Sequence, residues 1–316
     1  MIKAEGLTMH YGPVKALNNV SFTVGDGEIV ALLGPNGAGK STTMKILTTY
    51  LYPTQGTAQV AGFDVKENPL EARANIGYLP ENLPLYMDME VRGYLKFVGE
   101  SRGLRGAKLK ERTDMVLEEC ALKPMYRKVV RELSKGYRQR TGLAQALIHN
   151  PGVIILDEPT SGLDPHQILE IRELIRSLAK GKTVLLSTHI LQEVEASADR
   201  VVIISRGDLI ANGTVAELKK QATDHDRVRI AVKGDAKEIE RGLSAVPGAS
   251  KVVTLDETNG YTTFSVLGSP DSELWKAVSD TARSNNWELK ELANEPLTLE
   301  ETFLTLTEKA GKGGVE

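Results

Sequence analysis

Short runs of consecutive apolar residues recur along the first two thirds of the chain, and each is followed by a segment whose apolar residues are spaced three or four apart. Continuous apolar runs of this length are typical of strands buried on both faces of a parallel sheet, and the wider spacing is typical of the helices that connect them. The pattern therefore predicts an open α/β sheet. The expected strands contain the runs IVALL, VIIL, VLL and VVII, and helices are expected within 35–51 and over 166–180 and 190–198.

The first domain departs from this pattern in two places. Segments 3–12 and 18–27 predict shorter antiparallel strands added at the flank of the sheet. Between Glu67 and Arg131 we expect no strands, so a helical subdomain, at about 82–150, should interrupt the sheet. The helical spacing covers 90–104 and 108–122.

A second domain is expected after the polar segment TDHD at 223–226. From there the pattern indicates strand, helix, strand, strand, helix, strand, which is the order of a ferredoxin-like α+β module. We therefore expect a first domain over 1–220 and a C-terminal domain over 225–316, closing with an amphipathic helix at 297–311. The C-terminal domain contains no obvious catalytic or metal-binding cluster, so two roles stay open for it: stabilising a dimer, or regulation.

Composition restricts the partners. The chain has 39 basic and 42 acidic residues, a formal charge of −3, so it lacks the basic excess that favours nucleic acid, and no nucleic-acid partner is expected. Cys120 is the only cysteine, which excludes an internal disulfide and a zinc site built from several thiolates. The apolar runs are shorter than the roughly 20 residues of a membrane-spanning helix, and the N-terminal segment lacks the apolar core of a secretion signal. We expect a chain that does not itself span a membrane.

The segment GPNGAGKST fits the spacing G-x-x-x-x-G-K-[ST] of a phosphate-binding loop, and it lies between an expected strand and an expected helix. Its glycines let backbone N–H groups point at phosphate oxygens, and the positive end of the helix adds to the attraction. Lys40 is suited to neutralising the outer phosphates, and the Ser41 hydroxyl to binding Mg²⁺. The nucleotide-binding residues expected here are Gly34, Asn36, Gly37, Ala38, Gly39, Lys40, Ser41 and Thr42.

Two carboxylates follow the later apolar run VIIL. Asp157 ends this expected strand, where its carboxylate can hold Mg²⁺ through a water molecule. Glu158 can accept a proton from an attacking water, which makes it the expected general base. An isolated acidic pair after a strand is usually a solvated turn, but the phosphate-binding loop in the same domain favours a role at a nucleotide-binding site with Mg²⁺.

These motifs resemble those of the ATP-binding cassette (ABC) family, and the segment LSKGYRQR resembles the signature of that family, usually written Leu-Ser-Gly-Gly-Gln. Leu133, Ser134 and Gly136 match it, whereas Lys135 and Tyr137 depart from it. The resemblance implies a P-loop NTPase cassette in which Ser134 and Gly136 bind the γ-phosphate held by a second cassette, so that two subunits enclose two ATP molecules. The alternative is that Ser134 only caps a helix with a solvated basic face.

The same resemblance implies roles for further residues. Tyr11 matches the aromatic residue that stacks on adenine, Asp164 in SGLDP matches the residue that faces the partner subunit, and His189 matches the histidine that contacts the γ-phosphate and orients the water. For Tyr11 and His189 the alternative is an ordinary surface position. Glu81 stands where the family usually has a glutamine that reaches Mg²⁺, and its carboxylate can supply such an oxygen. The alternative is that Glu81 points to solvent.

The resemblance covers residues 1 to about 215 and implies an ATPase that powers a separate membrane permease through closure of a dimer. The segments YLPENLPLY and LTLEETFLTLT are similar to cassettes of the ABC-2 exporter type, including those named for gliding motility. Export is favoured over import, because sugar-importer cassettes usually end in an all-β module. The expected partners are an integral membrane permease and a second copy of the chain, and the expected location is the cytoplasmic face of the membrane. The alternative is a soluble ABC ATPase acting on ribosomes or DNA, although such relatives carry two cassettes, long coiled coils or zinc cysteines.

Overall fold

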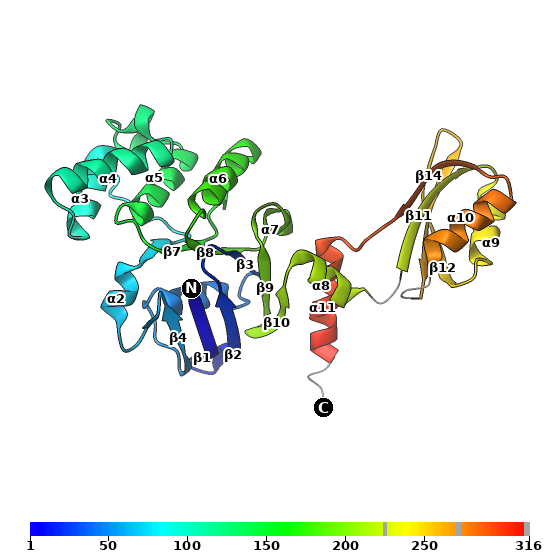
Figure 1. The fold of residues 1–316 in the computed structure, drawn as a ribbon, viewed down its shortest axis with the longest axis horizontal. Coiled ribbons are helices and arrows are strands. Elements are labelled where there is room, and N and C mark those ends of the chain that lie inside the picture. Colours follow the sequence, from blue (N-terminus) through cyan, green and yellow to red (C-terminus); the bar gives the residue numbers. More distant parts are fainter. Residues whose placement is uncertain (224–225, 270–272, 313–316) are drawn as a thin grey trace. The chain divides into compact units, whose positions relative to one another are not determined.

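The computed structural model describes residues 1–223, 226–269 and 273–312, and the chain divides into two compact units, Met1–Val215 and Ala216–Glu316 (Figure 1). Two residues of the expected polar link at 223–226, the start of the second expected helix of the C-terminal domain and the last four residues of that domain lie outside the described residues. Each unit is described by itself.

The first unit alternates strands and helices. Its strands are β1 (Ile2–Tyr11), β2 (Val14–Val24), β3 (Ile29–Leu33), β4 (Gln55–Val60), β5 (Phe63–Asp64), β6 (Ile76–Leu79), β7 (Val153–Asp157), β8 (Thr183–Thr188), β9 (Arg200–Ser205) and β10 (Asp208–Gly213). Its helices are α1 (Lys40–Leu47), α2 (Pro69–Ala74), α3 (Val91–Ser101), α4 (Gly106–Glu119), α5 (Lys135–Leu147), α6 (Pro165–Leu178) and α7 (Leu191–Ser197), with two 3₁₀ turns, η1 (Lys123–Met125) and η2 (Val130–Glu132). Helix α8 (Val215–Ala222) follows at the boundary of the units.

A six-stranded sheet in the order β10-β9-β3-β8-β7-β6 forms the centre of this unit. All of its neighbouring strands are parallel except the edge pair β9 and β10. Every residue of β3, β7 and β8 is buried, as the apolar runs predict for strands covered on both faces. The expectation of an α/β sheet with crossover helices is therefore confirmed.

The expectation that no strand lies between Glu67 and Arg131 is wrong. Strand β6 (Ile76–Leu79) lies in this interval and pairs in parallel with β7, Ile76 beside Val153. The sequence gives little sign of it because the strand has four residues, one of them a glycine. Gly77 is required there, since a Cβ would lie 2.4 Å from the Ala146 carbonyl oxygen.

The N-terminal strands are antiparallel, as expected, but they are neither short nor part of the central sheet. Strands β1 and β2 have 10 and 11 residues and form a separate sheet with β4 and β5, in the order β2-β1-β4-β5. Register shifts break the alternation of β1, which is why its pattern is weak in the sequence. Apolar residues of this sheet, of α1 and of the central sheet share one core.

Helices α3, α4 and α5 lie between β6 and β7 in the chain and stand together, away from β1, β2 and β4, in Figure 1. Helix α3 buries Val91, Tyr94 and Leu95, which share one face at three-to-four spacing. Two residues beyond α5, His149 places its Nε2 3.0 Å from the Ile76 carbonyl oxygen, while its Nδ1 is buried without a partner. Burial and then the charge of Arg102 lower the pKa of His149 to about 4.

The second unit has its own core. It contains β11 (Asp226–Lys233), α9 (Ala236–Ser244), β12 (Ala249–Thr258), β13 (Tyr261–Gly268), α10 (Leu274–Ser284), β14 (Glu288–Asn294) and α11 (Leu299–Lys312). The antiparallel sheet has the order β12-β13-β11-β14, and the core joins its apolar face to α9 and α10. Helix α11 begins with a reciprocal cap, in which Glu301 accepts from the Thr298 N–H at 2.9 Å and Thr298 accepts from the Glu301 N–H at 3.2 Å.

Candidate functional site

The parallel strands of the first unit bring several polar segments to one edge of the central sheet. Leu33 of β3 pairs with Thr188 of β8, and Asp157 of β7 pairs with Ser187. The phosphate loop, Glu158 and His189 are the next residues after these three strand ends. Because the carboxyl ends of parallel strands meet at the same edge, the fold itself assembles these residues, which lie far apart in the chain.

The phosphate loop is held close to the sheet. A Cβ on Gly34 would lie 2.2 Å from the Ile204 carbonyl oxygen, so only glycine fits there. Gly37 and Gly39 have φ values of 78° and 111°, in the left-handed region that favours glycine. Lys40 begins α1 and donates to the Gly34 carbonyl oxygen at 2.7 Å. The loop therefore presents backbone and a cation at the start of a helix, as an anion site requires.

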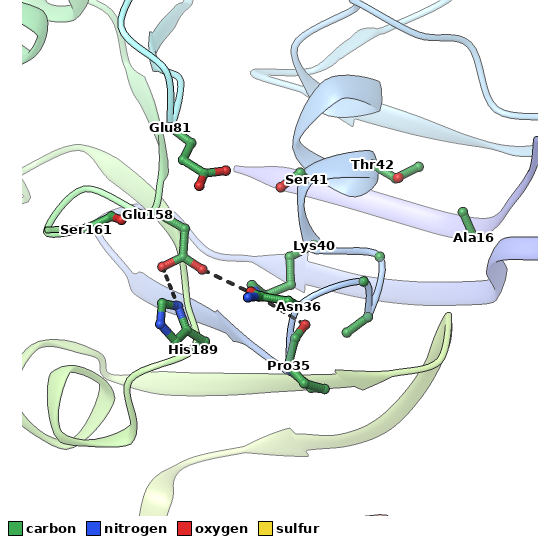
Figure 2. A pocket seen from close by; sticks show the side chains of 13 residues that line it. Ala16, Pro35, Asn36, Lys40, Ser41, Thr42, Glu81, Glu158, Ser161 and His189 are labelled. Atoms are coloured by element: carbon green, nitrogen blue, oxygen red, sulfur yellow. Dashed lines mark hydrogen bonds and ion pairs between the residues drawn. The ribbon is translucent and has the colours of Figure 1, made fainter.

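Glu158 contacts both positively ionisable groups of this edge. Its Oε1 lies 3.4 Å from Lys40 Nζ, and its Oε2 lies 2.9 Å from His189 Nδ1 (Figure 2). Lys40 and Glu158 are only 6% and 8% exposed, whereas His189 is 45% exposed. The backbone of Glu158 has φ 49°, a conformation that costs a non-glycine residue about 1 kcal/mol or more. The turn thus holds this carboxylate in one strained and defined place.

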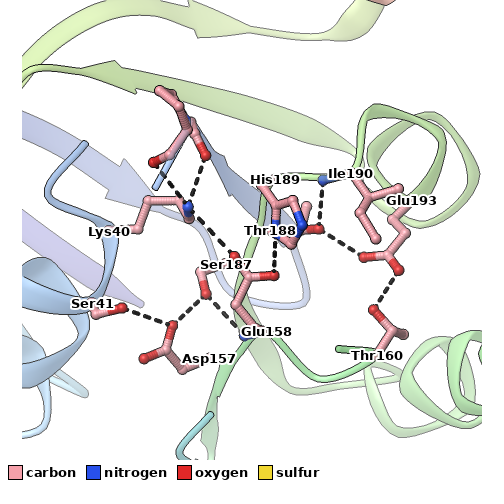
Figure 3. A network of polar contacts seen from close by, with 12 residues as sticks. Lys40, Ser41, Asp157, Glu158, Thr160, Ser187, Thr188, His189, Ile190 and Glu193 are labelled. Atoms are coloured by element: carbon pink, nitrogen blue, oxygen red, sulfur yellow. Dashed lines mark hydrogen bonds and ion pairs between the residues drawn. The ribbon is translucent and has the colours of Figure 1, made fainter. Parts of the chain in front are cut away.

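Asp157 lies beneath the cleft and does not line it. Its Oδ1 accepts from the Ser187 hydroxyl at 2.5 Å and from the Ser41 hydroxyl at 3.5 Å. Ser187 in turn accepts from the Glu158 N–H at 3.0 Å, so one hydroxyl fixes both acidic residues (Figure 3). Sequence reasoning missed Ser187, although its place at the end of an apolar strand next to His189 was a usable signal.

A cleft of about 540 Å³ opens over the phosphate loop. Its lining includes the exposed side chain of Glu81, which lies near Ser41 in Figure 2. Burial, and then the negative charges of Asp157 and Glu81, raise the pKa of Tyr78 to about 12. The carboxylates of Asp157 and Glu81 therefore both lie close enough to Tyr78 to affect its pKa. The lining is made by Ala16, Pro35, Asn36, Gly37, Ala38, Gly39, Lys40, Ser41, Thr42, Glu81, Glu158, Ser161 and His189.

The structure does not bring every expected nucleotide-binding residue to this cleft. Tyr11 ends β1, is 43% exposed and is absent from the lining, whereas Ala16 of β2 belongs to it. Ser161, three residues after Glu158, also lines the cleft and was not foreseen. No sequence pattern singles out Ala16, because its position depends on how the antiparallel sheet packs beside the loop.

Ser134, Gly136 and Asp164 form a second group, outside the cleft lining. Ser134 caps α5 and Asp164 caps α6, accepting from backbone N–H groups at 3.4 Å and 2.9 Å. The two helix starts are neighbours, since a Cβ on Gly136 would lie 2.8 Å from the side chain of Gln167 in α6. Ser134 and Asp164 are exposed, so this pair of helix starts presents polar groups to the surroundings. Capping by Ser134 and the expected anion contact are compatible.

Comparison with known proteins identifies the family. The family described as ABC transporter matches residues 17–161, and a second description, AAA domain, putative AbiEii toxin, Type IV TA system, matches only residues 129–195. The daunorubicin resistance ATP-binding protein DrrA3 of Streptomyces coeruleorubidus is 35% identical over 310 residues, which cover 97% of this chain and 95% of that protein. This chain belongs to the ABC transporter ATP-binding family.

One further relative and one solved structure are also similar to this chain. The probable multidrug ABC transporter ATP-binding protein YbhF of Escherichia coli is 41% identical over 228 residues, which cover 72% of this chain but only 39% of YbhF. The solved dimeric structure of the cassette MJ0796, in a post-hydrolysis state bound to ADP and Pi, superposes with a TM-score of 0.62 at 25% identity, covering 68% of this chain and 98% of the other. Nucleotide binding in a P-loop cassette is thereby supported for the first unit.

The oxygen atoms around the ABC phosphate loop suit a hard cation. Among residues 1–223, 226–269 and 273–312, no cluster of three or more His, Cys, Asp or Glu side chains is placed to hold a metal ion. Mg²⁺ rarely needs such a cage, because one or two protein oxygens, water and substrate phosphates complete its octahedron. Ser41 and Asp157, 3.5 Å apart, and Glu81 of the same cleft are oxygen donors of this kind. The donor set therefore fits Mg²⁺.

Proposed function

We propose that this ABC subunit hydrolyses ATP to drive export through a separate, membrane-embedded permease. The contact of Glu158 with both Lys40 and His189, in the cleft over the phosphate loop, carries the ATPase part. The export part is supported by similarity to DrrA3, named as a resistance protein, over nearly the full length of both chains. Within the described parts of this chain, no helix has the length and apolarity to cross a membrane. An export pathway therefore needs another subunit.

The cleft residues take distinct roles in this proposal. Lys40 and the loop N–H groups bind the outer phosphates. Glu158 is the general base that accepts a proton from the attacking water, and His189, within hydrogen-bond distance of it, orients that water at the γ-phosphate. The burial of Lys40 and Glu158 strengthens these electrostatic contacts, because little solvent screens them.

Mg²⁺ would be held by the Ser41 hydroxyl, with Asp157 acting through a water molecule and Glu81 supplying a further oxygen. When bound, the ion neutralises charge that develops on the phosphates. The contact of Asp157 with Ser187 supports its role, since it fixes the aspartate beneath Ser41. Glu81 supplies charge where an amide would supply only a dipole.

A second copy of the chain is the proposed partner at Ser134, Gly136 and Asp164. These residues are outside the cleft lining of their own subunit, and Ser134 and Asp164 are exposed. Their helix starts are suited to the γ-phosphate held by the phosphate loop of the other subunit. The dimeric cassette structure of similar fold supports this arrangement. Tyr11 is proposed to stack on adenine, which its exposed place at the end of β1 permits.

An exposed apolar surface supports contact with the permease. Tyr86, in the segment after Glu81, packs edge-on against Phe97 of α3, with ring centroids 5.5 Å apart. Both rings are about half exposed, and Leu70, which shares a surface hollow with Phe97, is 70% exposed. Apolar patches of this kind mark protein contacts. Their place beside the Glu81 segment would let the permease sense the cleft.

The first experiment is co-purification of tagged Glu158→Gln protein from detergent-solubilised native membranes, followed by mass spectrometry. The expected result is a multi-spanning membrane protein in stoichiometric yield. Ribosomal or DNA-bound partners without a membrane protein would instead support the soluble alternative. Leu70→Glu in the same protein should release the membrane partner, while Leu169→Glu, at an exposed position of α6, is the matched control.

Hydrolysis and pairing are tested on the purified full chain. Lys40→Ala should abolish productive ATP binding, and normal turnover in that variant would exclude the proposed phosphate site. Glu158→Gln with ATP should elute as a dimer in gel filtration, because nucleotide stays bound between the subunits. A monomer under these conditions would count against the paired arrangement.

A further inference from the structure

A buried carboxylate lies outside the cleft and takes no part in the roles given above. Glu193 of α7 is 3% exposed, and its two carboxylate oxygens both accept from neutral hydroxyl groups. A buried charge without a cation is costly unless hydrogen bonds replace its hydration. The residues around Glu193 must therefore supply hydrogen-bond donors.

Those donors come from two separate segments, the loop after Glu158 and the end of strand β8. Thr160, two residues after Glu158, donates its hydroxyl to Oε1 of Glu193, and Thr188, directly before His189, donates to Oε2 at 2.7 Å (Figure 3). Both threonines are buried, with 3% and 0% exposure. One carboxylate thus bridges the loop after Glu158 and the end of β8, directly before His189.

The bridge also fixes the backbone beside His189. The Thr188 hydroxyl, while donating to Glu193, accepts from the Ile190 N–H at 3.0 Å. The residues on both sides of His189 are therefore tied to the same carboxylate. The first of them lies on a fully buried strand, β8, so the histidine has little freedom to move relative to α7.

We propose that Glu193 is a positioning residue for hydrolysis, which holds the Glu158 and His189 loops at one separation. This inference rests on the proposed function, because it assigns Glu193 to the same reaction. The 2.9 Å contact between Glu158 and His189 depends on that separation, although Glu193 touches neither side chain. Since misplacement of a reacting group by about 1 Å can cost 100-fold in rate, two polar contacts of this kind matter for turnover.

The test uses the full chain with Glu193→Ala, Glu193→Gln and, as the matched control, Gln192→Ala, which alters an exposed neighbour on α7. We expect Glu193→Ala to lower kcat about 10- to 100-fold while KM for ATP and the stoichiometry of nucleotide binding stay within twofold. Glu193→Gln should recover most of kcat, because its amide oxygen still accepts from one threonine and its NH₂ can donate to the other. Gln192→Ala should behave as wild type.

A purely structural role predicts a different result. It would lower nucleotide-binding stoichiometry and kcat together in Glu193→Ala, and Glu193→Gln would not restore them. That outcome would overturn the proposal. An unchanged kcat in Glu193→Ala would overturn it as well. Thr160→Val keeps the side-chain shape and removes one donor, so it repeats the test if the alanine variant folds poorly. It should lower kcat in the wild-type chain and have no further effect in Glu193→Ala, which has already lost the contact with Thr160.

Glu158→Gln, assayed in parallel, separates the two hypotheses. If wild type hydrolyses ATP and Glu158→Gln does not, the ATPase part of the proposed function stands, and the Glu193 variants alone decide the positioning role. If Glu158→Gln retains turnover, the general-base role of Glu158 fails, and the Glu193 proposal fails with it.

Discussion

Replacement of Glu158 by glutamine removes one charge from a buried pair and leaves the shape of the side chain unchanged. At the 3.4 Å separation of Lys40 and Glu158, an effective dielectric constant of about 20 gives a gross attraction of about 5 kcal/mol. The pair competes with ATP, because Lys40 is the group expected to meet the outer phosphates. Desolvation of the two ions offsets much of the gross attraction. We therefore expect the variant to bind ATP more tightly by roughly 1.4 kcal/mol, which is a tenfold lower Kd.

The same substitution should remove the base. Loss of general-base catalysis costs about 10²- to 10⁴-fold in rate, so kcat should fall by that factor while ATP binding becomes tighter. Phosphate release measures kcat, and titration calorimetry measures the Kd. Turnover within threefold of wild type, or weaker binding of ATP, would refute the reasoning.

A second pair of residues offers a matched control. Glu118 and Lys123 are 3.1 Å apart, but their side chains are 73% and 61% exposed. Exposed pairs contribute about 0–1 kcal/mol, since water screens them. Glu118→Gln therefore makes the same chemical change without burial and should leave both Kd and kcat within experimental error of wild type.

Further predictions concern the loop, a buried histidine and the cleft. Gly34→Ala should abolish ATP binding and cost about 1–3 kcal/mol in the free energy of unfolding, because its Cβ would meet the Ile204 carbonyl oxygen at 2.2 Å, whereas Gly152→Ala, with nothing within 4 Å, should be neutral in both assays. The pKa of His149 is lowered by burial from 6.5 to about 4, so the unfolded chain binds more protons between these values and stability falls as pH drops through this window. Urea unfolding at pH 7 and pH 4.5 measures this fall in the free energy of unfolding. In His149→Gln the fall should be smaller than in wild type by about 1–2 kcal/mol, after allowance for partial exposure of the ring. Equal falls in the two proteins would contradict the assignment. Glu81→Gln should keep turnover within about threefold across a Mg²⁺ titration, since both side chains supply an oxygen, and a large loss would mean that the negative charge is required.

The sequence predicts the fold best where one local signal is strong. The runs that became β3 and β7 are apolar throughout because both faces of these strands are covered, and the phosphate loop needs its glycines within a few residues of each other. Strand β6 has only four residues, and β1 carries register shifts, so neither shows the expected periodicity. Their existence depends on partners elsewhere in the chain.

The residues of the site also differ in how readily the sequence reveals them. Lys40, Glu158 and His189 are recognisable because each follows a strand within a motif, and the structure brings them into contact. Ala16 and Glu193 carry no local signal, since one enters the cleft through packing of a second sheet and the other is proposed to act through a threonine on a loop and a threonine at the end of β8. Contacts between distant segments are the part that a single sequence does not reveal.

The separate core of Ala216–Glu316 has a consequence for heat denaturation. Two units with their own apolar interiors need not melt as one cooperative block, so calorimetry should resolve two endotherms. MgATP at 100 times its Kd should raise only the endotherm of Met1–Val215, by an amount equivalent to about 2.7 kcal/mol, because the phosphate loop lies in that unit. The endotherm of Met1–Val215 would thus report nucleotide occupancy, and the endotherm of the second unit would serve as an internal reference.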